Sequence, residues 1–176
     1  MKRPAKSKYE PDTKIKKRNL AFYDLEFTGL NFDHEVVEIG CVLVSQPDYK
    51  IVKEWLVKIK PSHIENADKN SLRIVEYSDE KWKNALSLKK ALNEFNKIAK
   101  GAVLIGYNSV WDFMFLKKAY YEAGLDPAFH WQNLDVLPMA FTLLNGENIK
   151  GFRMVEVANF LKIKKLHWHN PLDDAM

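Results

Sequence analysis

Residues 19–30 have the sequence NLAFYDLEFTGL, and this stretch decides the fold. Its first part, Asn19–Leu25, is short, apolar and aromatic, which predicts a buried strand. Asp24 and Glu26 close that strand two positions apart, so both carboxylates project from the same face. Two carboxylates held side by side repel each other unless a cation lies between them, and oxygen ligands favour Mg²⁺ or Mn²⁺. The stretch therefore predicts a strand that ends in a metal site.

Two more strands are expected directly after this one. Val36–Val44 (VVEIGCVLV) is rich in β-branched residues, and Ile51–Ile59 (IVKEWLVKI) alternates more loosely between apolar and polar residues. Residues 46–49 (QPDY) between them are typical of a turn. Three strands in succession with short links predict an antiparallel meander.

The pattern then changes to helical periods that alternate with short apolar runs. Apolar residues recur every three or four positions between Leu86 and Ile98, which predicts a helix that Ser87 caps. The later elements expected are a buried strand at 102–105, a helix from Ser109 to Gly124, a strand at 131–134, a helix from Asp135 to about 144 and a last helix at 154–161. Together these elements predict an α/β domain with a mixed five-stranded central sheet, an antiparallel meander followed by parallel strands, flanked by helices.

Length and composition suit one folded domain with a basic leader. The 176 residues are 47% apolar, enough for a substantial core. Residues 1–19 carry eight Lys or Arg against two acids. We therefore expect a basic, disordered tail at 1–18 and the folded domain at 19–176. The tail either contacts phosphates, which would add salt dependence, or is a solvated leader; its sequence fits both.

The compartment is indicated by one residue and one missing pattern. Cys41 is the only cysteine, so an intrachain disulfide is impossible and a reducing cytoplasm fits best. No stretch reaches the roughly 18 apolar residues that a membrane span needs. We therefore expect a cytoplasmic protein with no membrane partner.

Two further segments carry acids that could join the first pair. Residues 106–113 (GYNSVWDF) place Asp112 in the first turn of a helix, directly after a buried strand. Residues 169–175 (HNPLDDA) place His169 five positions before Asp174. In isolation, Asp112 would be a helix-capping acid and the histidine–acid pair would mean little.

Together the three segments resemble the DEDDh family of 3′→5′ exonucleases, which includes a proofreading subunit of bacterial replicative polymerase. The resemblance runs from about Asn19 to Ala175, and D-x-E-x-T-G-L is its most specific motif. It implies an RNase H-like fold. It also implies that the metal-binding acids are Asp24, Glu26, Asp112 and Asp174, and that His169 is the histidine that distinguishes this branch; Asp173 is one residue too early to match.

The resemblance further implies a mechanism. Two divalent cations, Mg²⁺ or Mn²⁺, would straddle the scissile phosphate, and His169 would take the proton from the attacking water. Phe27 and Thr28 would contact the 3′-hydroxyl through their backbone, and Leu30 would wedge against a base. Core packing is nearly as good an interpretation of Phe27 and Leu30. Asn108 either orients the site or caps the following helix.

The expected partner is the 3′ end of a single-stranded nucleic acid, with release of nucleoside 5′-monophosphates. DNA and RNA are equally compatible with the motifs, and so are work beside a polymerase and work alone. The sequence is silent on oligomeric state. The alternatives are a catalytically weak or inactive binding module of the same fold, or another RNase H-like nuclease such as an endonuclease.

Two expectations concern the surroundings of the motifs. Family members usually continue beyond the last motif as a full C-terminal helix, whereas this chain stops at Met176, so we expect that helix to be lacking and Asp174 to sit on a terminus that frays. His34, His63 and His130 are expected in loops or on the surface rather than in a site.

Overall fold

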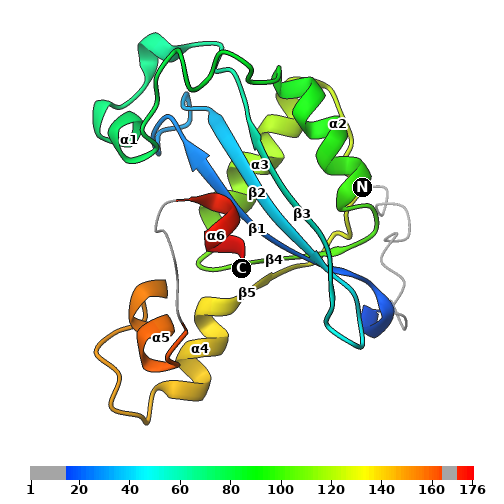
Figure 1. The fold of residues 1–176 in the computed structure, drawn as a ribbon, viewed down its shortest axis with the longest axis vertical. Helices are drawn as coiled ribbons and strands as arrows, with labels where there is room; N and C mark the ends of the chain where they lie inside the picture. The colour runs from blue at the N-terminus through cyan, green and yellow to red at the C-terminus, as the bar shows by residue number, and fades with distance from the viewer. Residues whose placement is uncertain (1–14, 164–169) are drawn as a thin grey trace, which may run out of the picture.

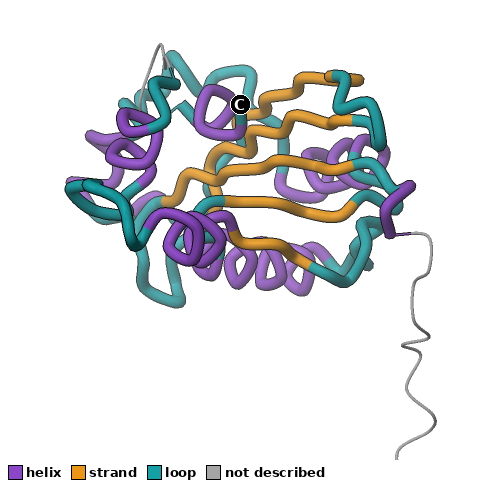
Figure 2. The backbone as a smooth tube through the Cα atoms, turned by 90° about the horizontal axis from the view of Figure 1, so that it is seen from below, coloured by secondary structure: helices purple, strands orange, loops and turns teal. Residues whose placement is uncertain are grey.

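The fold is built on a five-stranded sheet with the strand order β3-β2-β1-β4-β5 (Figures 1 and 2). The computed structural model describes residues 15–163 and 170–176. β2 pairs antiparallel with both β1 and β3, whereas β4 runs parallel to β1 and β5 parallel to β4, so the expected mixed sheet is confirmed. The strands are β1 (Leu20–Phe27), β2 (Val36–Val44), β3 (Ile51–Lys58), β4 (Val103–Gly106) and β5 (Asn133–Asp135).

The helices lie around this sheet at nearly the expected places. They are α1 (Lys69–Ile74), α2 (Leu88–Ile98), α3 (Val110–Ala123), α4 (Val136–Leu144), α5 (Met154–Phe160) and α6 (Pro171–Ala175), with short 3-10 turns η1 (Ile15–Lys17) and η2 (Ile64–Asn66). The sequence did not predict α1, α6 or the two 3-10 turns. Each spans at most six residues, too few for a helical period to be visible. No helix in the described ranges is long and apolar enough to cross a lipid bilayer.

The alternation of side chains along β1 separates two faces of the sheet. Tyr23 and Leu25 are buried on the face covered by α2 and α3, where they join the main core. Phe22 packs with Val42 and Ala175 on the opposite face, which carries α6. Figure 1 shows α6 lying on the sheet. Asp24 and Glu26 continue this second row of β1 side chains, so they emerge on the face that carries α6.

The carboxylate of Asp135, at the end of β5, holds the N-termini of two helices, α3 and α4. Asp135 accepts hydrogen bonds from the backbone N–H groups of Asn108 (2.8 Å) and Ser109 (3.0 Å), directly before α3. It also accepts one from the Leu137 N–H (2.9 Å) in the first turn of α4. Asp135 is therefore the N-cap of α4, and the same carboxylate fixes the N-terminus of the helix that carries Asp112.

α6 is short but firmly placed on the sheet. Asn170 caps it by accepting hydrogen bonds from the N–H groups of Leu172 and Asp173. Its backbone lies directly against Gly40 of β2, where an added Cβ would come within 2.2 Å of the Pro171 carbonyl. Glycine at position 40 therefore allows the close approach. The segment bearing Asp174 is thus a short helix packed on the sheet.

The folded part of the chain starts earlier than Asn19. Ile15–Lys17 form η1, and the Gln46 side-chain amide donates to the carbonyls of Ile15 (3.3 Å) and Arg18 (2.7 Å). The Arg18 guanidinium donates to the Gly101 carbonyl (2.9 Å). Residues 15–18, expected in the tail, are held by the turn after β2 and by the loop before β4.

His34 and His130 lie in loops, as expected, and both are buried. Only 5% of His34 and 8% of His130 is exposed. His34 fills the β1–β2 loop: its Nδ1 accepts from the Asn31 N–H (2.9 Å), and a Cβ on Gly29 (φ 152°) would collide with its ring. The glycine thus serves the packing of this loop, and His34 shapes the segment that presents Leu30.

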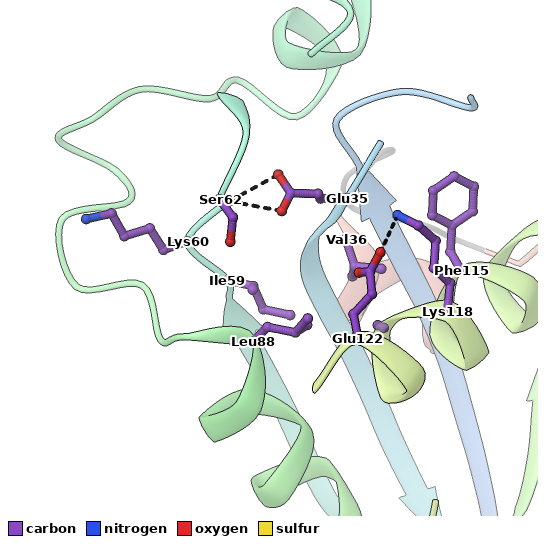
Figure 3. Close-up of a pocket in the computed structure, with 10 residues that line it drawn as sticks. Glu35, Val36, Ile59, Lys60, Ser62, Leu88, Phe115, Lys118 and Glu122 are labelled. Atoms are coloured by element: carbon purple, nitrogen blue, oxygen red, sulfur yellow. Dashed lines mark hydrogen bonds and ion pairs between the residues drawn. The ribbon is translucent and has the colours of Figure 1, made fainter. Parts of the chain in front are cut away.

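The same loop is tied to the chain beyond β3. The Glu35 carboxylate accepts hydrogen bonds from the backbone N–H groups of Ser62 (3.0 Å) and His63 (2.8 Å), as Figure 3 shows for Ser62. Both backbone groups of Thr28 are hydrogen-bonded: its N–H donates to the Glu35 carbonyl (2.8 Å), and its carbonyl accepts from the backbone N–H of Asp68 (2.8 Å). The loop after the D-x-E pair is therefore rigidly supported.

Candidate active site

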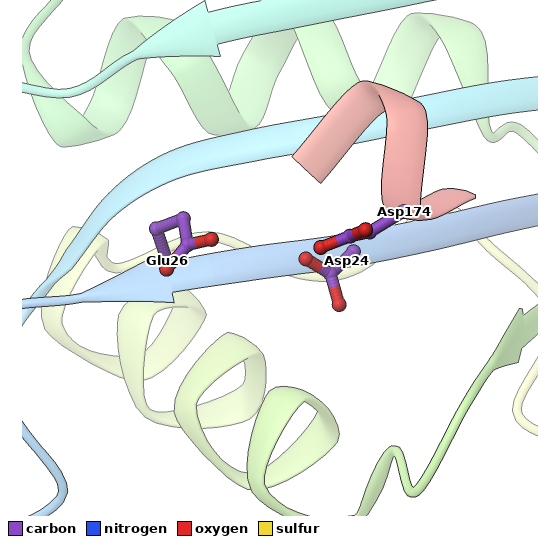
Figure 4. Close-up of side chains that lie close together, drawn as sticks. All are labelled: Asp24, Glu26 and Asp174. Carbon is purple, nitrogen blue, oxygen red and sulfur yellow. The ribbon is translucent and has the colours of Figure 1, made fainter. Parts of the chain in front are cut away.

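Carboxylates from the two ends of the chain meet on the α6 face of the sheet. Asp24, Glu26 and Asp174 each offer one oxygen, and these oxygens all lie within 4.8 Å of one another (Figure 4). Asp24 and Glu26 come from the end of β1, and Asp174 from α6. This spacing is compatible with a shared divalent cation.

Asp112 lies beside this group but belongs to α3. Its Oδ1 accepts a hydrogen bond from the backbone N–H of Leu25 (3.0 Å), the residue between Asp24 and Glu26. Asp112 is 9% exposed and lines the same pocket as the other three acids. The structure thus brings together all four acids that the sequence singled out.

Burial raises the proton affinity of two of these acids, Glu26 and Asp112. Desolvation, followed by the nearby charges of Glu38 and Asp112, raises the pKa of Glu26 to about 8. Desolvation likewise raises the pKa of Asp112 to about 6, against the lowering effect of its hydrogen bond from Leu25. A bound cation would offset both effects. The residues present therefore fit a hard divalent metal, with oxygen ligands and an excess of negative charge.

A second charged row lies next to Glu26. Glu38 sits directly across from Glu26 in the β1–β2 ladder and across from Lys58 in the β2–β3 ladder. Glu38 is buried and ion-paired to Lys58, whose ammonium lies 3.6 Å from the centre of the Trp82 ring. Burial raises the pKa of Glu38, and the hydrogen bond from Lys58 opposes that rise. Glu38 therefore belongs to an ion pair that borders the acid group.

The pocket that contains the four acids is lined by charged, polar and apolar residues. Residues from β1, the start of α3 and the start of α5 line it: Asp24, Leu25, Glu26, Phe27, Leu30, Tyr107, Asn108, Trp111, Asp112, Arg153, Met154, Val155 and Asp174. The sequence did not single out Tyr107 and Arg153. The Tyr107 hydroxyl donates to the Phe152 carbonyl (2.5 Å), which ties the end of β4 to the segment carrying Arg153. Nothing in the local sequence marks a contact across that many residues.

The expected substrate-contacting residues fall into two groups. Leu30 is 57% exposed and lines the pocket, as does Asn108, whose N–H is held by Asp135. Phe27 lines the pocket and also packs on Phe115, with ring centres 4.4 Å apart. Thr28 is buried and its backbone groups are paired within the loop, so it is placed to support the pocket from behind.

The remaining residue of the expected set, His169, lies outside the described residues. Asp173, treated as a neighbour of the site, lines an adjacent apolar pocket between β1 and α5 together with Phe22 and Val157. Asp174 borders both pockets.

Comparison with protein families gives one match over most of the chain. The family model RNase T, described as an exonuclease, matches residues 21–176. Among curated proteins, the chain is 30% identical over 154 residues to a PolC-type DNA polymerase III from Caldanaerobacter subterraneus subsp. tengcongensis, covering 87% of the chain and 10% of that protein. It is 29% identical to the corresponding Ureaplasma parvum protein, covering 66% of the chain and 8% of that protein. The chain thus spans about a tenth of the length of these relatives.

Solved structures support the fold. A structure of exonuclease I superposes with a TM-score of 0.76 at 14% identity and covers 90% of the chain and 38% of that protein. The E. coli exonuclease I complex with a dT13 oligonucleotide gives 0.75 at 16% identity, with 90% and 39% coverage. At this identity the likeness shows a shared fold, including the mixed sheet described above.

Proposed function

The chain belongs to the RNase T family of exonucleases, and from this membership we propose that it hydrolyses phosphodiester bonds at the 3′ end of single-stranded nucleic acid, releasing nucleoside 5′-monophosphates. The observation that carries the proposal is the convergence of Asp24, Glu26 and Asp174, with Asp112 held against β1 beside them. Carboxylates gathered this closely in a pocket, two of them (Glu26 and Asp112) with raised pKa values, are typical of sites that hold catalytic metals.

We assign the metal ligands to these four acids. Two divalent cations, Mg²⁺ or Mn²⁺, would supply an activated water and charge stabilisation at the leaving oxygen. Asp112 has the additional task of fixing the end of β1 through the Leu25 N–H. His169 is proposed as the general base, on its match to the histidine of the DEDDh branch and because histidine side chains in general exchange protons near neutral pH.

The substrate contacts are proposed from the pocket lining. Leu30 is exposed at the rim, which suits a wedge against the terminal base. Phe27 and Asn108 line the pocket beside it, where they contact the terminal nucleotide. Thr28 acts by holding the loop that carries Leu30.

DNA is the substrate that the comparisons favour. The relatives are DNA polymerases, and exonuclease I has been solved with deoxynucleotide oligomers. We therefore propose single-stranded DNA 3′ ends as substrate and a replicative polymerase as the partner, with residues 19–176 as the exonuclease domain. The single, buried Cys41 fits work in the reducing cytoplasm.

The test is stepwise shortening of 5′-labelled linear DNA with Mg²⁺, and its loss with chelator. A ladder that shortens one nucleotide at a time from the 3′ end supports the proposal. Cleavage of a circular single strand would indicate an endonuclease instead. Strand binding without release at any metal concentration would indicate an inactive binding module.

A matched pair of variants separates the site from its surroundings. Asp174→Asn removes a carboxylate from the acid group, whereas Asp173→Asn removes the neighbouring carboxylate of the same helix. We expect Asp174→Asn to reduce turnover by roughly 10²-fold or more and Asp173→Asn to leave it within about threefold. Equal losses would contradict the assignment.

A further inference from the structure

The exposed side of α3 carries an apolar and aromatic row that starts at the acid pocket. Trp111, Met114, Lys118 and Tyr121 recur at spacings of three, four and three, so they lie on one face of the helix. The opposite face of α3 is buried in the core. Phe32, from the β1–β2 loop, borders the same hollow. We call Phe32, Trp111, Met114 and Tyr121 the α3 stripe.

The α3 stripe is unusual for a helix surface facing water. Tyr121 is 88% exposed and Phe32 is 79% exposed, and Met114 and Trp111 are each more than 40% exposed. Isolated apolar side chains on a surface are ordinary, but a contiguous group around one hollow is typical of a binding surface.

The hollow of the α3 stripe lies next to the acid pocket. Leu30 and Trp111 line both of them. Trp111 directly precedes Asp112, so the stripe begins one residue from a proposed metal ligand. A strand whose 3′ end occupies the acid pocket has the stripe as a neighbouring surface for its next nucleotides.

The charge of the α3 stripe indicates which part of a strand it contacts. Lys118, the cation among the described residues that line the hollow, donates to the His34 carbonyl (2.6 Å) and is ion-paired with Glu122 (3.1 Å), as Figure 3 shows for Glu122. This pairing leaves the stripe nearly neutral, which suits nucleobases and not backbone phosphates. Exposed aromatic rings stack on bases without regard to sequence.

From these observations we propose that the α3 stripe binds the unpaired bases on the 5′ side of the terminal nucleotide. This inference rests on the proposed exonuclease function and adds a subsite to it. Stacking on the stripe makes the enzyme prefer single-stranded substrates of several nucleotides, because the faces of paired bases are not accessible to Tyr121 and Phe32. The sequence of those bases is not selected.

The experiment compares a substrate that occupies only the acid pocket with substrates that also extend over the α3 stripe. A chromogenic p-nitrophenyl ester of thymidine 5′-monophosphate fills the acid pocket alone, whereas oligothymidylates of two to eight nucleotides extend onto the stripe. For Phe32→Ala/Tyr121→Ala we expect KM for the octamer to rise roughly 5- to 100-fold, the loss of about one stacked base, with kcat unchanged. Hydrolysis of the ester stays as in the parent protein. The variant Phe32→Ala/Tyr121→Trp, which keeps an aromatic ring at position 121, recovers the octamer KM.

Tyr49→Ala, which removes an exposed aromatic ring from the β2–β3 connection, is the matched control and leaves every parameter unchanged. Fluorescence anisotropy of a labelled octamer in chelator measures binding without turnover, so it tests the stripe even if the parent protein hydrolyses neither substrate. An unchanged octamer affinity in Phe32→Ala/Tyr121→Ala overturns the inference. So does a change in oligomeric state, measured by sedimentation, because the stripe would then bind a second copy of the chain.

Discussion

Glu26 lies directly opposite Glu38 in the β1–β2 ladder, and the two acids are treated differently by their surroundings. Glu38 is neutralised by Lys58 in the next strand, whereas Glu26 projects into the acid pocket, where burial and neighbouring acids raise its pKa to about 8. Glu38 thus has a structural role in an ion pair, whereas Glu26 can release its proton when a cation binds.

The first prediction concerns the stability of the metal-free protein. Since the folded-state pKa of Glu26 is about 8 and its ordinary value is 4.5, the folded chain binds more protons than the unfolded chain between those values. Stability in chelator therefore falls as pH rises from about 4.5 to 8. Urea unfolding at several pH values measures this slope. Glu26→Gln should flatten it, and a stability that rises across this range would contradict the prediction.

Magnesium should reverse that trend. Metal binding requires the ionised carboxylates, so raising the pH toward 8 increases Mg²⁺ affinity, by up to about tenfold per pH unit for one displaced proton. Calorimetric titration at pH 6.5 and 8.5 in two buffers of different ionisation enthalpy measures both affinity and proton release. No proton release at pH 6.5 would mean that the acids are already ionised.

Lys58 is predicted to stabilise the fold through Glu38. Lys58→Met leaves a buried carboxylate without its partner and should cost roughly 1–3 kcal/mol, less than for a fully buried pair, because 34% of the Lys58 side chain is exposed. Adding Glu38→Gln should recover much of the loss, as measured by chemical denaturation of the single and double variants. Strict additivity of the two changes would show that the pair is not coupled.

Gly40 is predicted to control activity without belonging to the site. Gly40→Ala places a methyl group against the Pro171 backbone, so α6 must move and carry Asp174 away from Asp24. We expect Mg²⁺ affinity and turnover to fall by roughly tenfold or more while the circular dichroism spectrum is retained. Gly146→Ala is the control, because nothing lies within 4 Å of a Cβ at that position. Full activity of Gly40→Ala would mean that α6 tolerates displacement.

Asp112 should separate charge from hydrogen bonding. Asp112→Asn keeps an oxygen that can accept from the Leu25 N–H but removes the charge, so turnover falls by roughly 10²-fold while the melting temperature in chelator holds or rises. Asp112→Ala removes the acceptor as well and destabilises the fold by about 1–3 kcal/mol. Turnover and thermal melts of both variants test the distinction; equal melting temperatures would contradict it.

Much of the fold could be predicted because the strands and long helices carry strong local patterns. Val36–Val44 was predicted with its observed bounds, because a run rich in β-branched residues strongly favours a β-strand. α6 could not be predicted, because its five residues are held by Asn170 and by the missing side chain of Gly40, a residue far away in the sequence. Contacts of this kind leave no periodic signal.

The candidate site follows the same division. The D-x-E spacing alone predicts two carboxylates on one face, and the family resemblance implies which later acids join them. The hydrogen bond from the Leu25 N–H to Asp112 and the exposure of Tyr121 beside the pocket depend on how α3 packs on the sheet. The loop position of His34 was predicted but its burial was not, because an imidazole that hydrogen-bonds within its own loop looks, in sequence, like any surface histidine.

The position of α6 has a consequence for the protein during its synthesis. Asp24 and Glu26 leave the ribosome early, but their third companion arrives only when almost all of the described chain has been translated and its final helical turn has settled on Gly40. A nascent chain therefore carries an incomplete set of cation ligands. Until α6 emerges, the acid pocket lacks the Asp174 carboxylate, so any metal-dependent turnover that needs this ligand waits for that helix.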